Sequence, residues 1–181
     1  TMRPVTTPLP LPAHPASPLV PLLLTVECRL EPRELVLHYR LRGDPHLLRW
    51  PVPASPGRAD GLWQHTCFEA FIATEGAEAY HEFNFSPAGQ WAHYAFRAQR
   101  ERAPDPLQAP PPLIDRIDQP DGVDLIAVIE RRALPAGPWR LGLSAVLEDT
   151  HGRLSHCALH HPREKPDFHD PAGWTLHLPA A

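Results

Sequence analysis

The 181-residue chain lacks the features that mark two large classes of binding protein. It has 17 basic and 21 acidic residues, a formal net charge of −4, and no cluster of Lys or Arg. Binding to a nucleic-acid backbone requires such a basic footprint. No apolar run approaches the length that crosses a bilayer. We therefore expect neither a nucleic-acid partner nor a membrane partner.

Cysteine is also scarce. The three cysteines are far apart, odd in number and without a CxxC pair, so the sequence predicts neither a disulfide framework nor a structural zinc site. The segment "PLVPLLLTVEC" is apolar like an export signal, but Pro18 and Pro21 interrupt it. In addition, Glu27 stands before Cys28, where a lipoprotein processing site has small residues. The sequence therefore predicts a cytoplasmic protein with reduced thiols.

Helical periodicity is the third absence. The 25 prolines limit long helices and favour turns and strand edges, and no segment sustains an apolar stripe with a period of 3.6 residues. Residues 102–122, which separate two groups of strand-like runs, are expected to form an ordered surface loop, with one short strand at most. Runs with the two-residue period of strands are 22–30, 34–43, 63–74, 79–85, 90–96, 122–131, 139–149, 154–161 and 173–178.

These runs predict a single domain with one hydrophobic core. Many short strands without helices are typical of antiparallel sandwiches. We predict an all-β chain, an antiparallel β-sandwich with jelly-roll-like topology over residues 22–181, preceded by a proline-rich extended segment over residues 1–21. The residues expected to be buried are Phe68, Ile72, Phe83, Phe85, Tyr94, Phe96, Leu125, Ile129, Leu141 and Leu143.

The stretch "EFNFSPAGQWAHY", residues 82–94, predicts a β-hairpin. "SPAG" suits a type I turn, with proline second and glycine last. With all four residues in the loop, Asn84 faces Trp91 across the hairpin and Glu82 faces His93. The pleat then places Phe83, Phe85, Tyr94 and Phe96 on the core face, and Tyr80, Glu82, Asn84, Trp91 and His93 on the opposite face.

This opposite face has a composition suited to sugars. By the same parity, the preceding strand places Trp63 and Glu69 on its non-core side. An aromatic side chain covers the C–H face of a sugar ring, while carboxylates and amides pair with its hydroxyls. The alternative is structural: the tryptophans are partly buried under a loop, and Glu82 and Asn84 form the wet side of a half-exposed sheet.

Three segments resemble a known family. "LWQHTCFEAFI", "YHEFNFSPAGQW" and "HHPREKPDFH" are similar to bacterial proteins with a DOMON-like domain related to the family 9 carbohydrate-binding modules, over residues 22–178. The resemblance implies a β-sandwich that binds a ligand on one concave face or at its edge. In the sugar-binding relatives, two tryptophans sandwich a terminal sugar while Glu, Asn, Gln or Arg side chains hold its hydroxyls.

The resemblance also implies a set of binding residues. A Trp followed six residues later by Glu matches Trp63 and Glu69, and the strand "EFNF" supplies Asn84. The C-terminal loop "LHHPREKPDFHDPAGW" departs from the family because it offers Phe168 where a second tryptophan is expected, and Trp174 comes later in the chain. The predicted ligand-binding residues are Trp63, Glu69, Glu82, Asn84, Trp91, His160, His161, Lys165 and Phe168.

Alternatives to sugar binding remain open. Other DOMON relatives bind haem through a methionine, but the only methionine is Met2, no CxxCH motif exists, and a bis-histidine site among the 12 histidines would be required. Adjacent His160 and His161 point to opposite faces of a strand, so they predict no metal site. Glu69 and Glu82 could serve a glycoside-processing enzyme, and an exposed sheet edge could bind a protein. We predict a non-catalytic module without a cofactor that binds a sugar or glycoconjugate.

Overall fold

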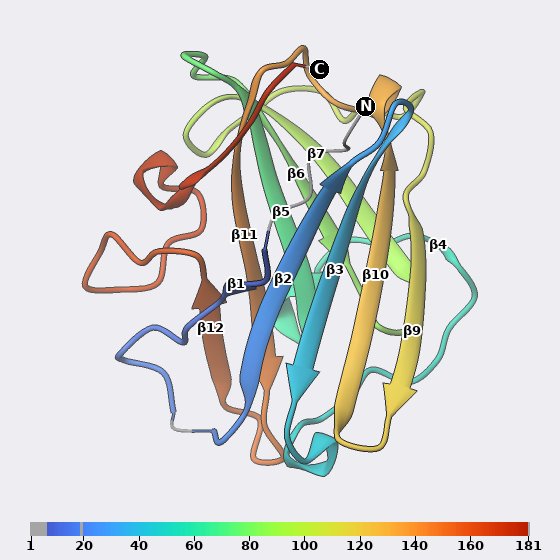
Figure 1. The fold of residues 1–181 in the computed structure, drawn as a ribbon, viewed down its shortest axis with the longest axis vertical. Coiled ribbons are helices and arrows are strands. Elements are labelled where there is room, and N and C mark those ends of the chain that lie inside the picture. The colour runs from blue at the N-terminus through green and yellow to red at the C-terminus, as the bar shows by residue number, and fades with distance from the viewer. Residues whose placement is uncertain (1–6, 19, 181) are drawn as a thin grey trace.

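The computed structural model describes residues 7–18 and 20–180 and consists of two packed β-sheets (Figure 1). Sheet A contains, in spatial order, β1 (Leu9–Pro10), β2 (Leu23–Leu30), β3 (Glu34–Arg42), β10 (Gly122–Glu130) and β9 (Leu113–Gln119). Sheet B contains β12 (Leu154–Ala158), β11 (Trp139–Glu148), β5 (Cys67–Thr74), β6 (Tyr80–Phe85), β7 (Gln90–Ala98) and β4 (Gly57–Arg58), with β13 (Leu176–Leu178) beside β11 and β8 (Glu101–Arg102) beside β7. The expected all-β sandwich is confirmed.

Pairing is antiparallel throughout the described strands except between β4 and β7. The helices of the described residues are four 3-10 turns, namely η1 (Pro45–Leu47), η2 (Leu62–Gln64), η3 (Arg131–Ala133) and η4 (Pro171–Gly173). In this part of the chain no helix has the length and apolar character that crossing a membrane would require.

The central core lies between the two sheets. Alternate residues of each strand point inward, so that Leu37 and Tyr39 of β3 and Leu125 of β10 are completely buried. From sheet B, Phe83 and Phe85 enter the same core. All ten residues that the sequence predicts to be buried are buried.

A second apolar cluster lies on the outer face of sheet B, away from sheet A. It contains Phe71, Ala73, Tyr80, Ala92, Tyr94, Phe96 and Trp174. Tyr94 and Phe96 were expected to share the core face with Phe83 and Phe85, and this expectation is wrong. They are buried on the outer face instead, Phe96 against His169 of the C-terminal loop and Tyr94 beneath Arg102, so one sheet has apolar side chains buried on both of its faces.

The register of the β6–β7 hairpin explains this difference. Phe85 pairs with Trp91, and Glu82 pairs with Tyr94. The amide of Ser86 donates to Gln90 O at 2.8 Å, so the loop has three residues rather than four. Gly89 has a φ of 99°, as in the left-handed residue that completes a three-residue hairpin loop. A shift of one residue moves every side chain of β7 to the other face.

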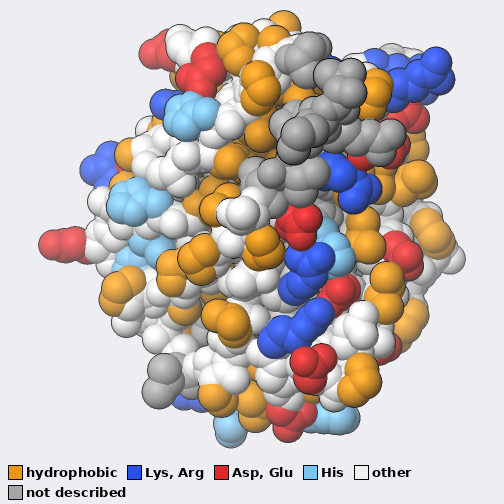
Figure 2. All heavy atoms as spheres, viewed as in Figure 1, with side chains coloured by type: hydrophobic (Ala, Val, Ile, Leu, Met, Phe, Trp, Pro, Cys, Tyr) orange, Lys and Arg blue, Asp and Glu red, His pale blue; other side chains and the backbone are white. Residues whose placement is uncertain are grey.

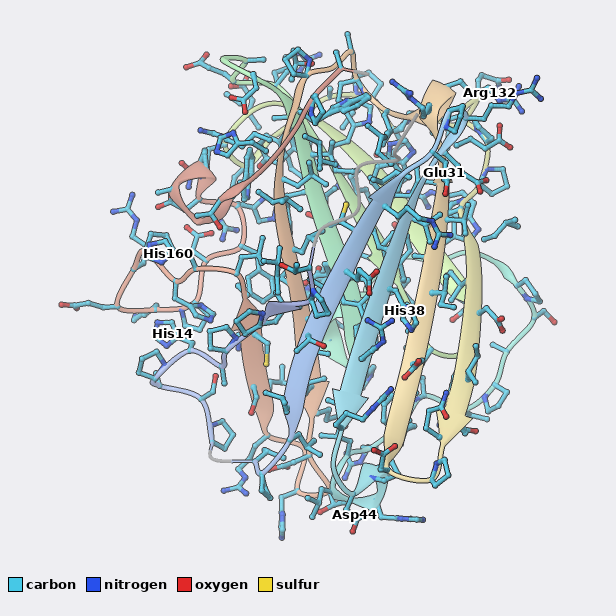
Figure 3. All side chains as sticks on the ribbon, viewed as in Figure 1. His14, Glu31, His38, Asp44, Arg132 and His160 are labelled. Atoms are coloured by element: carbon cyan, nitrogen blue, oxygen red, sulfur yellow. The ribbon has the colours of Figure 1, made fainter. Side chains whose placement is uncertain are left out.

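The described part of the proline-rich lead-in is docked onto both sheets. β1 pairs with β2, and Leu11 is buried in the central core. Ala13 forms a bridge with Cys157 of β12, and the amide of His14 donates to His156 O at 2.7 Å. His14 therefore lies on the same side of the sandwich as His160 of the C-terminal loop (Figure 3). The division between residues 21 and 22 stays a prediction.

The C-terminal loop, residues 159–175, is held against the outer face of sheet B by Trp174. The indole ring stacks on Phe71 with centroids 6.0 Å apart and meets Tyr80 edge-on at 4.7 Å. Its Nε1 donates to Phe168 O at 2.9 Å. A Cβ atom on Gly142 of β11 would lie 2.1 Å from Trp174 Cδ1, so glycine leaves the space that the ring fills.

Candidate functional site

A row of polar side chains crosses the outer face of sheet B. Glu69 of β5 pairs with Ser144 of β11 on one side and with Asn84 of β6 on the other. All three side chains are buried, with Asn84 completely so. Small residues end the row, since Ser144 pairs with Ala158 and Asn84 pairs with Ala92. The row therefore forms a polar strip in the floor of an otherwise apolar face.

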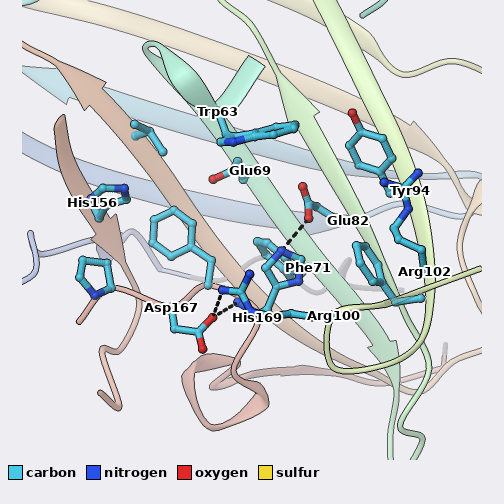
Figure 4. A pocket seen from close by; sticks show the side chains of 14 residues that line it. Trp63, Glu69, Phe71, Glu82, Tyr94, Arg100, Arg102, His156, Asp167 and His169 are labelled. Carbon is cyan, nitrogen blue, oxygen red and sulfur yellow. Dashed lines mark hydrogen bonds and ion pairs between the residues drawn. The ribbon is translucent and has the colours of Figure 1, made fainter. Parts of the chain in front are cut away.

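A cavity of about 410 Å³ lies above this face (Figure 4). Its floor includes Glu69 and Glu82, and aromatic rings form most of its walls. The lining residues are Trp63, Glu69, Phe71, Glu82, Tyr94, Phe96, Arg100, Arg102, Val146, His156, Pro166, Asp167, Phe168 and His169. The cavity volume lies in the range typical of small-molecule sites.

Trp63 reaches the cavity from η2 rather than from a strand. The turn packs against β5, β6 and β7, and 45% of the Trp63 surface remains exposed. The chain that follows is anchored by Thr66, whose hydroxyl donates to Arg49 O at 2.8 Å and accepts from the Glu148 amide at 3.0 Å. In Figure 4 the indole ring extends beside Glu69 toward Tyr94. It therefore offers a free aromatic surface at the mouth of the cavity.

Glu82 is the anchored carboxylate of the floor. Its Oε2 accepts from Asn84 Nδ2 at 3.0 Å, and its Oε1 lies 3.2 Å from His169 Nε2. His169 Nδ1 lies 2.7 Å from Tyr80 Oη, which itself accepts from the Arg100 amide at 3.0 Å. The loop that covers the face is thereby tied to the floor.

Glu69 is the isolated carboxyl of the floor. Glu69 is only 3% exposed, and its Oε2 is buried without a hydrogen-bond partner. Burial raises the pKa of Glu69 well above its ordinary value, and the charge of Glu82 raises this pKa further. Asn84 Oδ1 and Ser144 Oγ are also buried without a partner. Such atoms are rare in folded proteins and require an explanation.

Two arginines form the rim opposite Trp63. Arg100 Nη2 donates to Asp167 Oδ1 at 2.8 Å, which joins the β7–β8 turn to the C-terminal loop. Arg102 lies over the Tyr94 ring, 4.4 Å from its centroid, and donates to Asp105 at 2.5 Å. Both guanidinium groups thus have a carboxylate partner and remain at the edge of the cavity.

The predicted site residues separate into two groups. Trp63, Glu69, Glu82 and Phe168 line the cavity, with Asn84 buried beside them. The rest lie outside the lining: Trp91 shares a face with Phe85, His160 lines a minor pocket beside Trp174, His161 contacts Pro12 O, and Lys165 is exposed. The placement of Trp91 and His93 on the outer face is wrong, because the hairpin register differs by one residue.

His93 illustrates the consequence of this register. Its ring stacks on Phe83 with centroids 3.9 Å apart, on the inner face of sheet B. Burial, together with the neighbouring His81 and Arg58, lowers the pKa of His93 to about 3. His93 is therefore a neutral buried residue rather than a ligand contact.

Several lining residues were missed from the sequence. Tyr94 and Phe96 were assigned to the wrong face, whereas the parity of Phe71 with Glu69 does place Phe71 correctly. Arg100 and His169 enter the lining through loops, where no periodic signal exists. Their positions depend on long-range contacts, so the sequence alone offered no means of finding them.

The described residues contain no cluster of His, Cys, Asp and Glu that could hold a metal ion. The cysteines in this part of the chain, Cys28, Cys67 and Cys157, are buried.

Comparison with known proteins gives structural matches. No protein-family model and no curated protein sequence matches the chain. A Bacteroides uniformis protein to which carbohydrate binding has been attributed superposes with a TM-score of 0.65 at 20% identity, over 95% of this chain and 84% of that one. A family 9 carbohydrate-binding module from Caldicellulosiruptor kristjanssonii in complex with cellotriose gives 0.61 at 11% identity, over 87% and 75%. A glucose complex of such a module from that organism gives 0.57 at 12% identity, over 80% and 70%. At these identities, the likeness establishes the β-sandwich fold.

Proposed function

We propose that this chain is a non-catalytic module that binds a neutral sugar in the cavity on the outer face of sheet B. The floor supplies the two carboxyl groups of Glu69 and Glu82, and the mouth supplies the exposed ring of Trp63. Aromatic rings cover the C–H faces of sugars, and carboxyl groups pair with sugar hydroxyls. The combination fits a pyranose better than a wholly apolar ligand.

One observation carries the proposal. Glu69 Oε2, Asn84 Oδ1 and Ser144 Oγ are buried in adjacent strands and lack partners. Leaving buried polar atoms unpaired costs about 1–3 kcal/mol each, so a folded protein retains them where they have a use. Of these residues, Glu69 lines the cavity itself, and a sugar hydroxyl can pair with its carboxyl group because a hydroxyl both donates and accepts hydrogen bonds.

The solved structures support the same ligand class. Two of the structural neighbours are described as complexes with cellotriose and glucose. We extend that ligand class to this chain as part of the proposal, with cellotriose and glucose as the first probes. The relationship to DOMON-like domains and the cytoplasmic location stay predictions.

A pair of tryptophan variants tests the site. Trp63→Ala removes the aromatic surface at the cavity mouth, and we expect its affinity for the bound sugar to fall about thirtyfold, or roughly 2 kcal/mol. Trp91→Ala is the matched control, because Trp91 is a half-buried tryptophan of sheet B that lies outside the lining. Isothermal titration calorimetry with cellotriose and glucose would measure both affinities.

The stability of the variants decides whether Trp63 is a binding residue. Because the Trp63 side chain is 45% exposed, its truncation should destabilise the fold much less than Phe85→Ala, which costs about 3–5 kcal/mol in a packed core. An equal loss of sugar affinity in the two tryptophan variants would contradict the site. So would unfolding of Trp63→Ala as severe as that of Phe85→Ala.

A glycoside-processing role is the second candidate. Glu69 and Glu82 share one face but have different surroundings, and this is the pattern in which one carboxyl acts as an acid and the other as a base. Against this role, Glu82 is already engaged by Asn84 and His169. Release of glucose from cellotriose, lost in both Glu69→Gln and Glu82→Gln, would favour the enzyme over the binding module.

A further inference from the structure

The two carboxyl groups of the cavity floor differ in their partners. Glu82 accepts a hydrogen bond from Asn84 Nδ2, and His169 Nε2 lies within 3.2 Å of its Oε1. Glu69 has neither a donor for its Oε2 nor an ion pair with any described residue. Donors stabilise the charged form of a carboxyl group, and burial without donors stabilises the neutral form. The floor thus offers one carboxyl group with donors and one whose buried oxygen has none.

The orientation of His169 strengthens this difference. Tyr80 Oη accepts from the Arg100 amide, so its own proton is free to be donated to His169 Nδ1, 2.7 Å away. That arrangement leaves the other ring proton on Nε2, facing Glu82 Oε1. In this tautomer His169 donates from Nε2 to Glu82 Oε1 and supplies nothing to Glu69.

The charged groups around Glu69 offer it no compensation. Glu82 of β6 and Asp167 of the loop are acidic, and Asp167 already binds Arg100. Arg102, which follows β7, stacks on Tyr94 and donates a hydrogen bond to Asp105.

The remaining neighbours of Glu69 are not cations that contact it. On its own strand, Cys67 is a buried thiol, and from β11 Ser144 is a hydroxyl. From sheet A, Tyr39 Oη donates to the Glu69 backbone oxygen at 2.7 Å and leaves the carboxyl group alone. His156 of β12 lies at the far wall against Phe168, where burial and the nearby His14 and His161 lower its pKa.

We propose that Glu69 binds the ligand as a neutral carboxylic acid, with the proton on the carboxyl oxygen that faces the cavity and donated to an acceptor oxygen of the sugar. The inference rests on the proposed sugar-binding function and specifies the chemistry of that site. Glu69 then donates a hydrogen bond to an acceptor oxygen of the ligand, while Glu82 accepts one from a donor of the ligand. Two neighbouring hydroxyls of one sugar ring meet both demands, because each hydroxyl can donate and accept.

This state has a consequence for specificity and for pH. A ligand that carries a carboxylate at this position would face the charge of Glu82 without a free cation. Ionisation of Glu69 would remove the donor and place a second negative charge beside the ligand oxygen. Only the fraction of protein with a protonated Glu69 is then competent to bind, and the apparent affinity falls with that fraction.

The pH dependence of cellotriose affinity tests the proposal. In the wild-type protein, the affinity should fall by about tenfold per pH unit above the pKa of Glu69. In Glu69→Gln the amide replaces the donor and does not titrate, so this decline should disappear, whereas Glu69→Ala should bind weakly at every pH. Glu27→Gln on the outer face of sheet A is the control and should keep the wild-type decline. An affinity that rises with pH, or a decline that persists in Glu69→Gln, would overturn the proposal.

A second measurement on the ligand-free protein separates this inference from the proposed function. Carbon-13 NMR of the glutamate carboxyl groups at about pH 6, where an ordinary glutamate is ionised, should show one protonated carboxyl that is absent from Glu69→Gln. Complete ionisation in the wild-type protein would overturn the neutral state of Glu69 whatever ligand binds. If the protonated carboxyl is present but neither cellotriose nor glucose binds at any pH, the sugar-binding function is overturned and the donor role with it.

Discussion

The outer faces of the two sheets both carry charged residues, but among the described residues the buried side-chain polar atoms without a partner belong to strands of sheet B. On sheet A, Asp124 accepts from Arg42 at 2.6 Å and lies 2.8 Å from His38, and Arg40 donates to Glu27 at 2.8 Å. Figure 2 shows basic and acidic side chains alternating over this face, with His38 near its centre in Figure 3. On sheet B, Glu69 is buried and its Oε2 has no hydrogen-bond partner.

Polar residues of a sheet indicate function where their buried hydrogen-bonding atoms lack partners within the protein. The pairs on sheet A are complete without a ligand, so they account for their own presence as a solvated face. The strip of Ser144, Glu69 and Asn84 is not complete, although all three residues are buried. The two faces therefore differ in the partners of their polar atoms, and the outer face of sheet B also carries the C-terminal loop as a cover.

Removing the cover should have the largest effect on stability. Trp174→Ala deletes a buried ring that contacts Phe71 and Tyr80, and we expect a loss of about 3–5 kcal/mol in the free energy of unfolding. Ile126→Ala, a half-buried position on the outer face of sheet A, should cost far less. Urea denaturation would measure both. Equal losses of stability in the two variants would contradict the role of Trp174 in holding the C-terminal loop against sheet B.

Breaking a complete pair on sheet A should have the next largest effect. Burial by itself would raise the pKa of Asp124, but hydrogen bonds from Arg42 and His38 outweigh burial and leave this pKa below its ordinary value. Asp124 therefore stabilises the fold above the ordinary aspartate pKa, and this contribution is lost as pH falls. Asp124→Asn should cost about 1.5–3 kcal/mol near neutral pH, with a smaller cost in acid. A cost independent of pH would contradict the pairing.

Glu69 should show the opposite sign with a smaller effect. Its folded pKa is raised, so the folded state holds the proton more tightly than the unfolded chain does. Stability should fall as pH rises from about 4.5, the ordinary glutamate range, toward the folded pKa, by up to about 1.4 kcal/mol per pH unit. Glu69→Gln should lack this decline. Unfolding curves at a series of pH values would compare the variant with the wild-type protein, and parallel curves would refute the assignment.

The sequence determined which residues of each strand share a face. Leu37, Tyr39 and Leu41 recur at every second position of one strand, and the side-chain period of a strand is two whatever its partner, so this part of the central core follows from pattern alone. The sequence also predicted Trp63 and Glu69 on one side, and both line the cavity, although Trp63 arrives from a 3-10 turn rather than from the strand. The two-residue period also predicted Glu69 and Glu82 on the non-core face, and both line the cavity.

Only the tertiary structure decided how the strands face one another across the β6–β7 turn. Gly89 adopts a positive φ and shortens the effective loop to three residues, and a shift of one residue exchanges Tyr94 for Trp91 at the site. Whether a polar side chain has a hydrogen-bond partner likewise depends on residues that are distant in the sequence. Asp124 meets Arg42 from a strand 82 residues away in sequence, whereas Glu69 meets no donor for its Oε2. Local periodicity contains no information on either point, because both depend on which groups the folded chain brings within hydrogen-bond reach.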